Sequence, residues 1–495
     1  MSAARGLLDR RRAGVLLHPT SLPSPYGAGD LGHSAFRFVE FLAAAGVSVW
    51  QLLPLGPTHP DRSPYDAVSA FAGNPELISL DWLHDRGFLD AAMLSQLAAR
   101  ERDRASALAA AAAVFASRLD EDATLAADLD AFRERQAYWL EDYTLFVALR
   151  EAEDDAPWYR WPLPRRTRDP AALADARAAL ATRIDALVFE QYVFDRQWRE
   201  LADYAARVGV HTFGDIPIFV SHDSADVWAH PDLFRLSADG SLPVETGVPP
   251  DYFSADGQRW GNPHYDEDAM AREGYRWWRA RVALQRERFA LLRIDHFRGF
   301  EACWEIPQEA THAAQGRWIP GAGTPLLDAL SEVAGPGGLV AENLGTITEA
   351  VEALRLAHHM PGMLVFQFGF DGNPHNPHLP HNHVQHAVVY TGTHDNDTAL
   401  GWFLSLDEAL RECVRDYLGH PAEPMPQPLV RAVLASVAAL AVVPMQDLLG
   451  LDGSARMNRP GLARGNWGWQ LPDTPFDAAL AARFRRLLSL YGRLC

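Results

Sequence analysis

Eight short segments rich in β-branched and bulky apolar residues recur along this chain, and most of them end in polar or glycine-containing loops. Amphipathic stretches with helical spacing, such as 34–45 and 348–358, lie between several of them. Strand followed by helix, repeated, predicts a parallel sheet with crossover helices, and eight repeats favour an α/β fold of the closed (β/α)₈ TIM barrel type. An open doubly wound sheet is the alternative. The expected strands are 13–18, 48–55, 210–220, 291–297, 339–345, 363–370, 387–394 and 442–448.

The length of 495 residues fits one barrel spanning 1–495 with large inserted subdomains. We expect a mainly helical insertion at 57–200, because much of it is rich in Ala, Leu, Arg and Glu with helical spacing of the apolar residues. We expect a second excursion at 221–290, which shows no sustained period before a helix at 266–289. Within it, the segment GVPPDYFSADGQRW at 247–260 is a candidate lid, with a static wall as the alternative.

Composition excludes several functions. The net charge of −19 repels nucleic-acid phosphates and anionic lipid, so we expect neither nucleic acid nor a membrane as partner. The chain has no lysine, so all 45 basic residues are arginine, which excludes lysine Schiff bases and a Walker A lysine. Three widely spaced cysteines indicate neither a disulfide framework nor a zinc cluster, and no apolar run suits a signal peptide or a membrane span. We expect a cytoplasmic protein.

Three of the apolar runs end on a carboxylate: Asp295, Glu342 and Asp395. Because the carboxyl ends of barrel strands meet at one face, we expect these acids to share one mouth. Three converging acids repel unless one is protonated or a cation is bound. No calcium-binding loop and no HExxH motif accompanies them, so we expect no metal.

Two carboxyl groups suffice for glycosidic chemistry, one attacking the anomeric carbon and one protonating the leaving oxygen, and the third can hold sugar hydroxyls. Arg293 precedes Asp295 by two residues, hence shares its strand face, where its charge would keep Asp295 ionised. Glu342 would then need a raised pKa to act as the acid. Aromatic and polar residues suited to sugar accompany them, namely Tyr65, Trp260, His296, His394 and Asn396. Read singly, Arg293 and Asp295 fit a structural ion pair equally well, and the aromatic residues and histidines are more typical of ordinary packing and hydrogen-bonded core positions.

Several sequence segments resemble the motifs of a known family. They include GVLLHPTSLPSPYGAGDLG, WQLLPLGPTH, SPYDAVSAFAGNPELISL, GDIPIFVSHDSADVWAHPDLF, GVPPDYFSADGQRWGNPHY, LLRIDHFRG, AENLG, YTGTHDND, VPMQDLLG, MNRPG and GNWGWQL. In this order the chain resembles the amylomaltases, the 4-alpha-glucanotransferases of glycoside hydrolase family 77. The resemblance implies transfer of α-1,4-glucan segments to the 4-hydroxyl of an acceptor glucan or glucose, without a cofactor. An α-glucan hydrolase or debranching enzyme and a non-catalytic glucan-binding scaffold are the alternatives.

The resemblance also implies residue roles. The family's nucleophile falls on Asp295, its acid/base on Glu342 and its transition-state-stabilising aspartate on Asp395. Asn343 stands where the family usually has aspartate, which removes a negative charge beside Glu342. Neither the donor length nor a choice between monomer and homodimer follows from the sequence. Sugar-contacting roles are implied for Tyr65, Asp215, Gln258, Trp260, Arg293, His296, His394 and Asn466.

Overall fold

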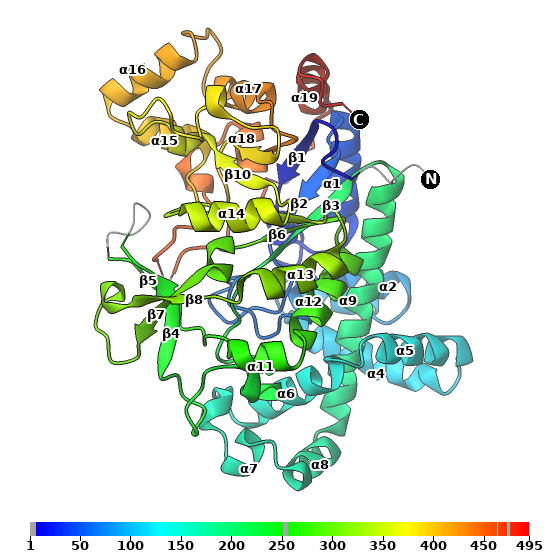
Figure 1. Ribbon diagram of the computed structural model, residues 1–495. Helices are drawn as coiled ribbons and strands as arrows, with labels where there is room; N and C mark the ends of the chain where they lie inside the picture. Colours follow the sequence, from blue (N-terminus) through cyan, green and yellow to red (C-terminus); the bar gives the residue numbers. More distant parts are fainter. Residues whose placement is uncertain (1–5, 251–255, 463, 473–475, 495) are drawn as a thin grey trace, which may run out of the picture.

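A parallel sheet of eight strands forms the centre of the molecule in a computed structural model that describes residues 6–250, 256–462, 464–472 and 476–494 (Figure 1). The strand order is β10-β11-β12-β1-β2-β3-β6-β9, so strands that follow one another in this sheet along the sequence are also neighbours in space. Such an order does not reverse direction and excludes the doubly wound alternative. The strands are β1 (Arg12–Leu16), β2 (Val49–Gln51), β3 (His211–Ile216), β6 (Leu291–Ile294), β9 (Leu339–Ala341), β10 (Gly362–Val365), β11 (Ala387–Tyr390) and β12 (Leu440–Pro444).

The two end strands of this sheet meet and nearly close it. The N–H of Ala341 on β9 donates to the carbonyl of Pro361, 2.9 Å away, just before β10. Beyond the end of β9, the side chain of Asn343 accepts from the N–H of Met363 at 2.7 Å and donates to Glu352 at 2.6 Å. Asn343 therefore joins β9 to β10, and the expected (β/α)₈ barrel is confirmed with all eight strands inside the expected segments or within two residues of them.

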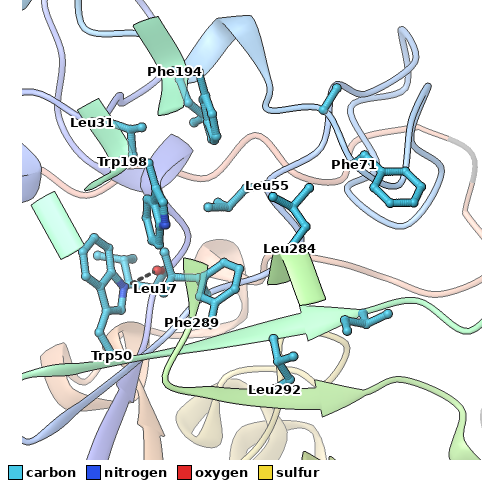
Figure 2. Close-up of a cluster of buried hydrophobic side chains, with 14 of the residues drawn as sticks. Leu17, Leu31, Trp50, Leu55, Phe71, Phe194, Trp198, Leu284, Phe289 and Leu292 are labelled. Carbon is cyan, nitrogen blue, oxygen red and sulfur yellow. Dashed lines mark hydrogen bonds between the residues drawn. The ribbon is translucent and has the colours of Figure 1, made fainter. Parts of the chain in front are cut away.

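Alternate residues of the strands serve two buried layers, as the two-residue period of a strand requires. On β12, Leu440 and Val442 belong to the barrel interior, whereas Ala441 and Val443 belong to the layer beneath the helices. Figure 2 shows part of that outer layer, where the indole N–H of Trp50 donates to the carbonyl of Leu17 at 2.8 Å. Burial of side chains on both faces explains why these strands read as continuous apolar runs.

Helices surround the barrel (Figure 1). Helix α1 (His33–Ala45) follows β1, and α19 (Ala478–Leu490), the last helix, packs beside α1. The expected helix 34–45 is α1, which ends at Gly46 in the left-handed conformation (φ 75°). The expected helix 348–358 is α14, which begins after Thr348, whose hydroxyl accepts from the N–H of Val351. Helix α14 spans Glu349–Ala357. The other outer helices are α13 (Gly323–Ala334), α15 (Ala399–Ser405), α16 (Glu408–Tyr417), α17 (Gln427–Ala435) and α18 (Met445–Leu449).

The chain between β2 and β3 is mainly helical, and its helices lie together at the lower part of Figure 1 beside the long α9. Of the apolar residues that suggested helices, Leu108, Phe115, Leu129 and Phe132 are buried. The side chains of Asp103 and Asp122 cap the first turns of α4 and α5. The helices are α2 (Leu80–Asp85), α3 (Ala91–Ala98), α4 (Arg104–Leu119), α5 (Ala123–Arg135), α6 (Leu140–Ala152), α7 (Leu163–Arg166), α8 (Pro170–Ala179) and α9 (Ala181–Arg207).

The chain after β3 holds two features that differ from the sequence-based expectation. A second, antiparallel sheet in the order β5-β4-β7-β8 joins residues on both sides of β6, at β4 (Val244–Val248), β5 (Gln258–Arg259), β7 (Ala302–Pro307) and β8 (Arg317–Pro320). The helix expected at 266–289 is two helices, α11 (Glu267–Arg272) and α12 (Arg276–Arg288), after the short α10 (Ala225–Ala229). Gly274 (φ 66°) and Tyr275 (φ 57°) interrupt it, since a left-handed backbone cannot continue a right-handed helix.

Of the candidate lid at 247–260, residues 251–255 lie outside the described residues. Among the helices that the structure describes, none combines the length and apolar character needed to cross a bilayer.

Candidate active site

A cleft of about 640 Å³ opens at the carboxyl ends of the barrel strands. Asp295 follows β6, Glu342 follows β9 and Asp395 lies in the loop after β11, and all three line this cleft. The small antiparallel sheet adds Gln258 and Trp260 to the wall. The fold thus brings three acids that are far apart in sequence to one opening of sugar size.

Arg293 links two carboxylates from neighbouring strands. It pairs with Asp215 of β3 in the sheet register, and its Nη1 donates to Asp215 Oδ2 in a short ion pair whose two side chains are almost fully buried. Its Nη2 donates to Asp295 Oδ1 at 2.5 Å, and Asp295 keeps 28% of its side chain exposed. The Tyr65 hydroxyl donates to Asp215 Oδ2 at 2.7 Å. Asp215 therefore anchors the guanidinium and the tyrosine that flank Asp295.

Both oxygens of Glu342 accept backbone N–H groups. The N–H of His296 donates to Oε2 at 2.7 Å and that of Leu344 to Oε1 at 2.9 Å. Because the nitrogen of His296 is bonded to the carbonyl carbon of Asp295, this contact fixes the Glu342 carboxyl directly beside the backbone of Asp295. His296 has a left-handed backbone (φ 52°), which is uncommon outside glycine and occurs at functional sites.

Asp395 is held from two sides. Asn458 Nδ2 donates to its Oδ1 at 2.6 Å, and His394 Nε2 lies 3.3 Å from its Oδ2. The His394 ring stacks on Tyr65, with ring centroids 5.2 Å apart and planes 9° apart. Tyr65 thus connects the Asp395 side of the cleft to the Arg293 network.

Burial raises the pKa of the Asp295 carboxyl well above its ordinary value, Arg293 opposes the rise, and the neighbouring carboxylates add to it. Arg293 therefore opposes the effect of burial without cancelling it, so the ion pair alone does not account for an ionised Asp295. Burial also raises the pKa of Glu342, against the effects of Arg293 and the two backbone donors. Acids this close titrate as a group and favour holding a proton between them.

The nearby histidines are neutral at neutral pH. Burial and the Arg298 guanidinium lower the pKa of His296 to about 4. Burial also lowers the pKa of His394, and Asp395 opposes that shift. Both rings therefore act as neutral hydrogen-bonding and packing groups rather than as cations.

The other residues expected to contact sugar divide into two groups. Tyr65, Gln258, Trp260, Arg293, His296 and Asn466 line the cleft, whereas Asp215 and His394 lie behind these lining residues and hold Arg293, Tyr65 and Asp395. The Trp260 indole meets the His296 ring edge-on at 4.9 Å, and its N–H donates to Gln258 Oε1 at 3.1 Å. Asn466 shapes its own loop by donating to the Leu462 carbonyl at 2.8 Å.

Asn458 and Trp467 are among the cleft residues that the sequence did not single out. Asn458 bonds to Asp395, and Trp467 packs against Tyr65 and His394 at 5.9 Å and 6.0 Å between ring centroids. Both lie in the loops after β12, which carry no periodic pattern. Their only signal is membership of the MNRPG and GNWGWQL segments.

Among the described residues, one group of side chains places its potential ligand atoms close enough for a metal ion, and it lies outside the cleft. It consists of Glu412, Asp416 and His420, all exposed, on α16 and the turn after it. The carboxylates of the cleft instead have arginine, amide and backbone partners, which suits acid, base and nucleophile roles.

Comparison with known proteins identifies the family. A family model described as 4-alpha-glucanotransferase matches residues 17–475. The 4-alpha-glucanotransferase of Thermus thermophilus is 46% identical over 98% of this chain and 99% of its own length, and the chloroplastic/amyloplastic enzyme of Solanum tuberosum is 43% identical over 98% and 87%. The solved amylomaltase of Streptococcus agalactiae in complex with acarbose superposes with a TM-score of 0.92 at 34% identity, covering 98% of this chain and all of that one. The chain belongs to the 4-alpha-glucanotransferases, the amylomaltase family of glycosyl-transferring enzymes that act on α-1,4-glucans.

Proposed function

We propose that this chain disproportionates maltooligosaccharides or other α-1,4-glucans by a double displacement with retention of configuration, carried by Asp295 and Glu342. One observation supports this pairing most directly: the N–H that follows Asp295 in the chain donates to the Glu342 carboxyl. Two carboxyl groups held on adjacent strand ends can divide attack and proton delivery at one glycosidic bond.

In the first step, Asp295 forms a bond to the anomeric carbon while the bond from that carbon to the leaving 4-oxygen breaks. Glu342 gives its proton to that oxygen, so a glucan with a free 4-hydroxyl leaves and a glycosyl ester remains on Asp295. In the second step, Glu342 takes the proton of an acceptor 4-hydroxyl as its oxygen attacks the anomeric carbon. Asp295 departs as a carboxylate, and the same linkage is re-formed.

The partners of the two acids support this division of labour. Arg293 donates directly to Asp295, which favours negative charge there. Glu342 accepts neutral backbone N–H groups and is more deeply buried, so the shared proton is better placed on Glu342. Arg293 thereby separates a nucleophile from an acid in one cleft.

Asp395 is proposed to bind hydroxyl groups of the sugar that carries the reacting carbon. Its carboxylate is fixed by Asn458 and His394, and it lines the cleft together with Asp295. Hydrogen bonds from sugar hydroxyls to a fixed carboxylate strengthen as positive charge develops at the anomeric carbon. Tyr65, Gln258, Trp260, His296 and Asn466 are proposed as further sugar contacts, with Asp215, Arg293 and His394 holding the acids in place.

We also propose one catalytic barrel over 1–495 with an inserted helical subdomain at 57–200 and an excursion at 221–290. The pairing of β4 with β7 supports an extension of the excursion past β6. Cys303 and Cys413 carry free thiols, which supports a reducing compartment such as the cytoplasm.

Incubation with maltotriose tests the activity. Transfer predicts glucose together with a ladder of longer glucans, and Asp295→Asn should abolish both. Hydrolysis would give only shorter products. A glucan-binding scaffold would give no products and would bind maltotriose equally well with Asn at position 295.

A further inference from the structure

Trp318 on β8 is a large aromatic residue left partly open to solvent in the wall of the cleft. It is 36% exposed, and it lines the same cleft as Asp295 and Glu342. Its cross-strand partner Trp304 packs against it with ring centroids 5.0 Å apart and planes 65° apart. An aromatic ring that is open to a ligand cleft can stack on the apolar face of a bound sugar.

The indole is held in place before any ligand arrives. The guanidinium carbon of Arg298 lies 3.5 Å from the centre of the Trp318 ring, and Arg298 itself is buried and donates to the Thr346 carbonyl. The Trp304 indole N–H donates to the Ala313 carbonyl at 2.8 Å, which fixes the second tryptophan. The guanidinium covers one face of Trp318 and Trp304 packs against the ring, so the 36% that stays exposed belongs to the rest of its surface. A ring fixed in this way loses little conformational entropy when a ligand stacks on it.

The position of this ring relative to the acids indicates which part of the substrate it meets. Tyr65, His394 and Asp395 form one connected side of the cleft. Arg298 belongs to the side that carries Glu342, because it follows His296, whose N–H binds Glu342, and because it bonds to Thr346, four residues beyond Glu342. Glu342 is the proposed proton donor, so the glucan beyond the leaving oxygen extends toward Arg298 and Trp318.

The geometry points to Trp318 as an acceptor-side platform, on which the apolar C–H face of a glucose unit stacks when the acceptor glucan enters. This inference rests on the proposed transfer mechanism and adds a residue that selects sugar over water in its second step. Aromatic rings bury apolar area at low entropic cost, and water gains nothing from such a surface. Loss of the ring should therefore weaken acceptor binding more than glycosyl-enzyme formation.

The test uses α-maltotriosyl fluoride as donor and maltose as acceptor. Fluoride leaves without a sugar on the acceptor side, so fluoride release reports the first step and the maltose dependence of product formation reports the second. For Trp318→Ala we expect the KM for maltose to rise about tenfold, equivalent to about 1.4 kcal/mol, with a larger share of hydrolysis. Trp318→Phe should restore most of the affinity. Trp82→Ala is the matched control, because Trp82 is also stacked under an arginine, Arg86 at 3.6 Å, but lies on α2 outside the cleft residues.

Two results would overturn the platform. One is an unchanged KM for maltose and an unchanged share of hydrolysis in Trp318→Ala. The other is an equal fall of fluoride release and transfer in both Trp318 variants, which would indicate a purely structural role. A wild-type protein that releases fluoride but forms no longer glucan would instead contradict the proposed transferase function, whatever the Trp318 variants do.

Discussion

Arg293→Met tests how strongly the guanidinium of Arg293 favours the ionised, nucleophilic form of Asp295. The guanidinium nitrogen lies 2.5 Å from Asp295 Oδ1, which puts the charge centres about 4 Å apart and their attraction at about 4 kcal/mol for an effective dielectric constant of about 20. Loss of that attraction raises the pKa of Asp295 and lowers its ionised fraction by at most about a thousandfold. We expect kcat/KM for maltotriose to fall by up to that factor at neutral pH.

The sign of the pH dependence follows from the nucleophile. Asp295 attacks only as the carboxylate, and removal of Arg293 raises its pKa further, so the deficit of the variant should shrink as pH rises. Folding stability should also fall by about 3–5 kcal/mol, because the buried Asp215 loses its counter-charge. Profiles of kcat/KM between about pH 5 and 9, with urea unfolding at each pH, measure both effects.

Arg104→Met provides the matched control for that experiment. Arg104, at the start of α4, and Asp30, in the loop before α1, form an ion pair at 3.7 Å with both side chains 9% exposed, and neither residue lines the cleft. Its loss should reduce stability and leave the pH profile of kcat/KM unchanged. An Arg293→Met enzyme whose pH profile of kcat/KM matches that of the wild type, or whose deficit stays constant with pH, would refute the assignment of Arg293 to the charge of Asp295.

Three further changes have defined outcomes. Glu342→Gln should lower maltotriose turnover about 10²- to 10⁴-fold yet retain a rapid initial burst of fluoride release from α-maltotriosyl fluoride, since fluoride needs no proton donor; equal losses of the burst and of maltotriose turnover would contradict the acid role. Asn458→Ala removes the 2.6 Å hydrogen bond to Asp395 and should reduce kcat about 10- to 100-fold with little change in Tm, measured by steady-state kinetics and calorimetry. Burial raises the pKa of Asp447 to about 6, so the contribution of this group to stability should fall as pH rises from about 4 through about 6, and Asp447→Asn should show a smaller fall than wild type in urea unfolding at the two pH values.

The sequence predicts the barrel well because its strands are buried on both faces and carry continuous apolar runs. The small sheet is different, since its strands are stabilised by charge pairs rather than by an apolar pattern. Glu305 of β7 lies opposite Arg317 of β8 and bonds to it at 2.7 Å, and Glu245 of β4 pairs with Arg259 of β5. Such pairs look like surface residues in a sequence, so no period reveals the strands.

The same contrast applies to the cleft. Asp295 and Glu342 follow apolar runs, so their positions at strand ends follow from the alternation of strands and helices. Asn458 lies in an irregular loop 63 residues after Asp395, and only tertiary structure brings the two side chains into contact. The prediction of one continuous helix at 266–289 is wrong for a local reason, because the sequence pattern does not show that Tyr275 adopts a left-handed backbone.

Trapping the glycosyl-enzyme tests the central claim most directly. Glu342→Gln is mixed with α-maltotriosyl fluoride, quenched in acid, digested and analysed by mass spectrometry. Without its acid/base, the second step slows and the intermediate should accumulate, with a maltotriosyl group on the peptide that contains Asp295. A label on the peptide of Asp395 or of another acid, or an unlabelled protein that still turns over the fluoride donor, would contradict the assignment of Asp295 as the nucleophile.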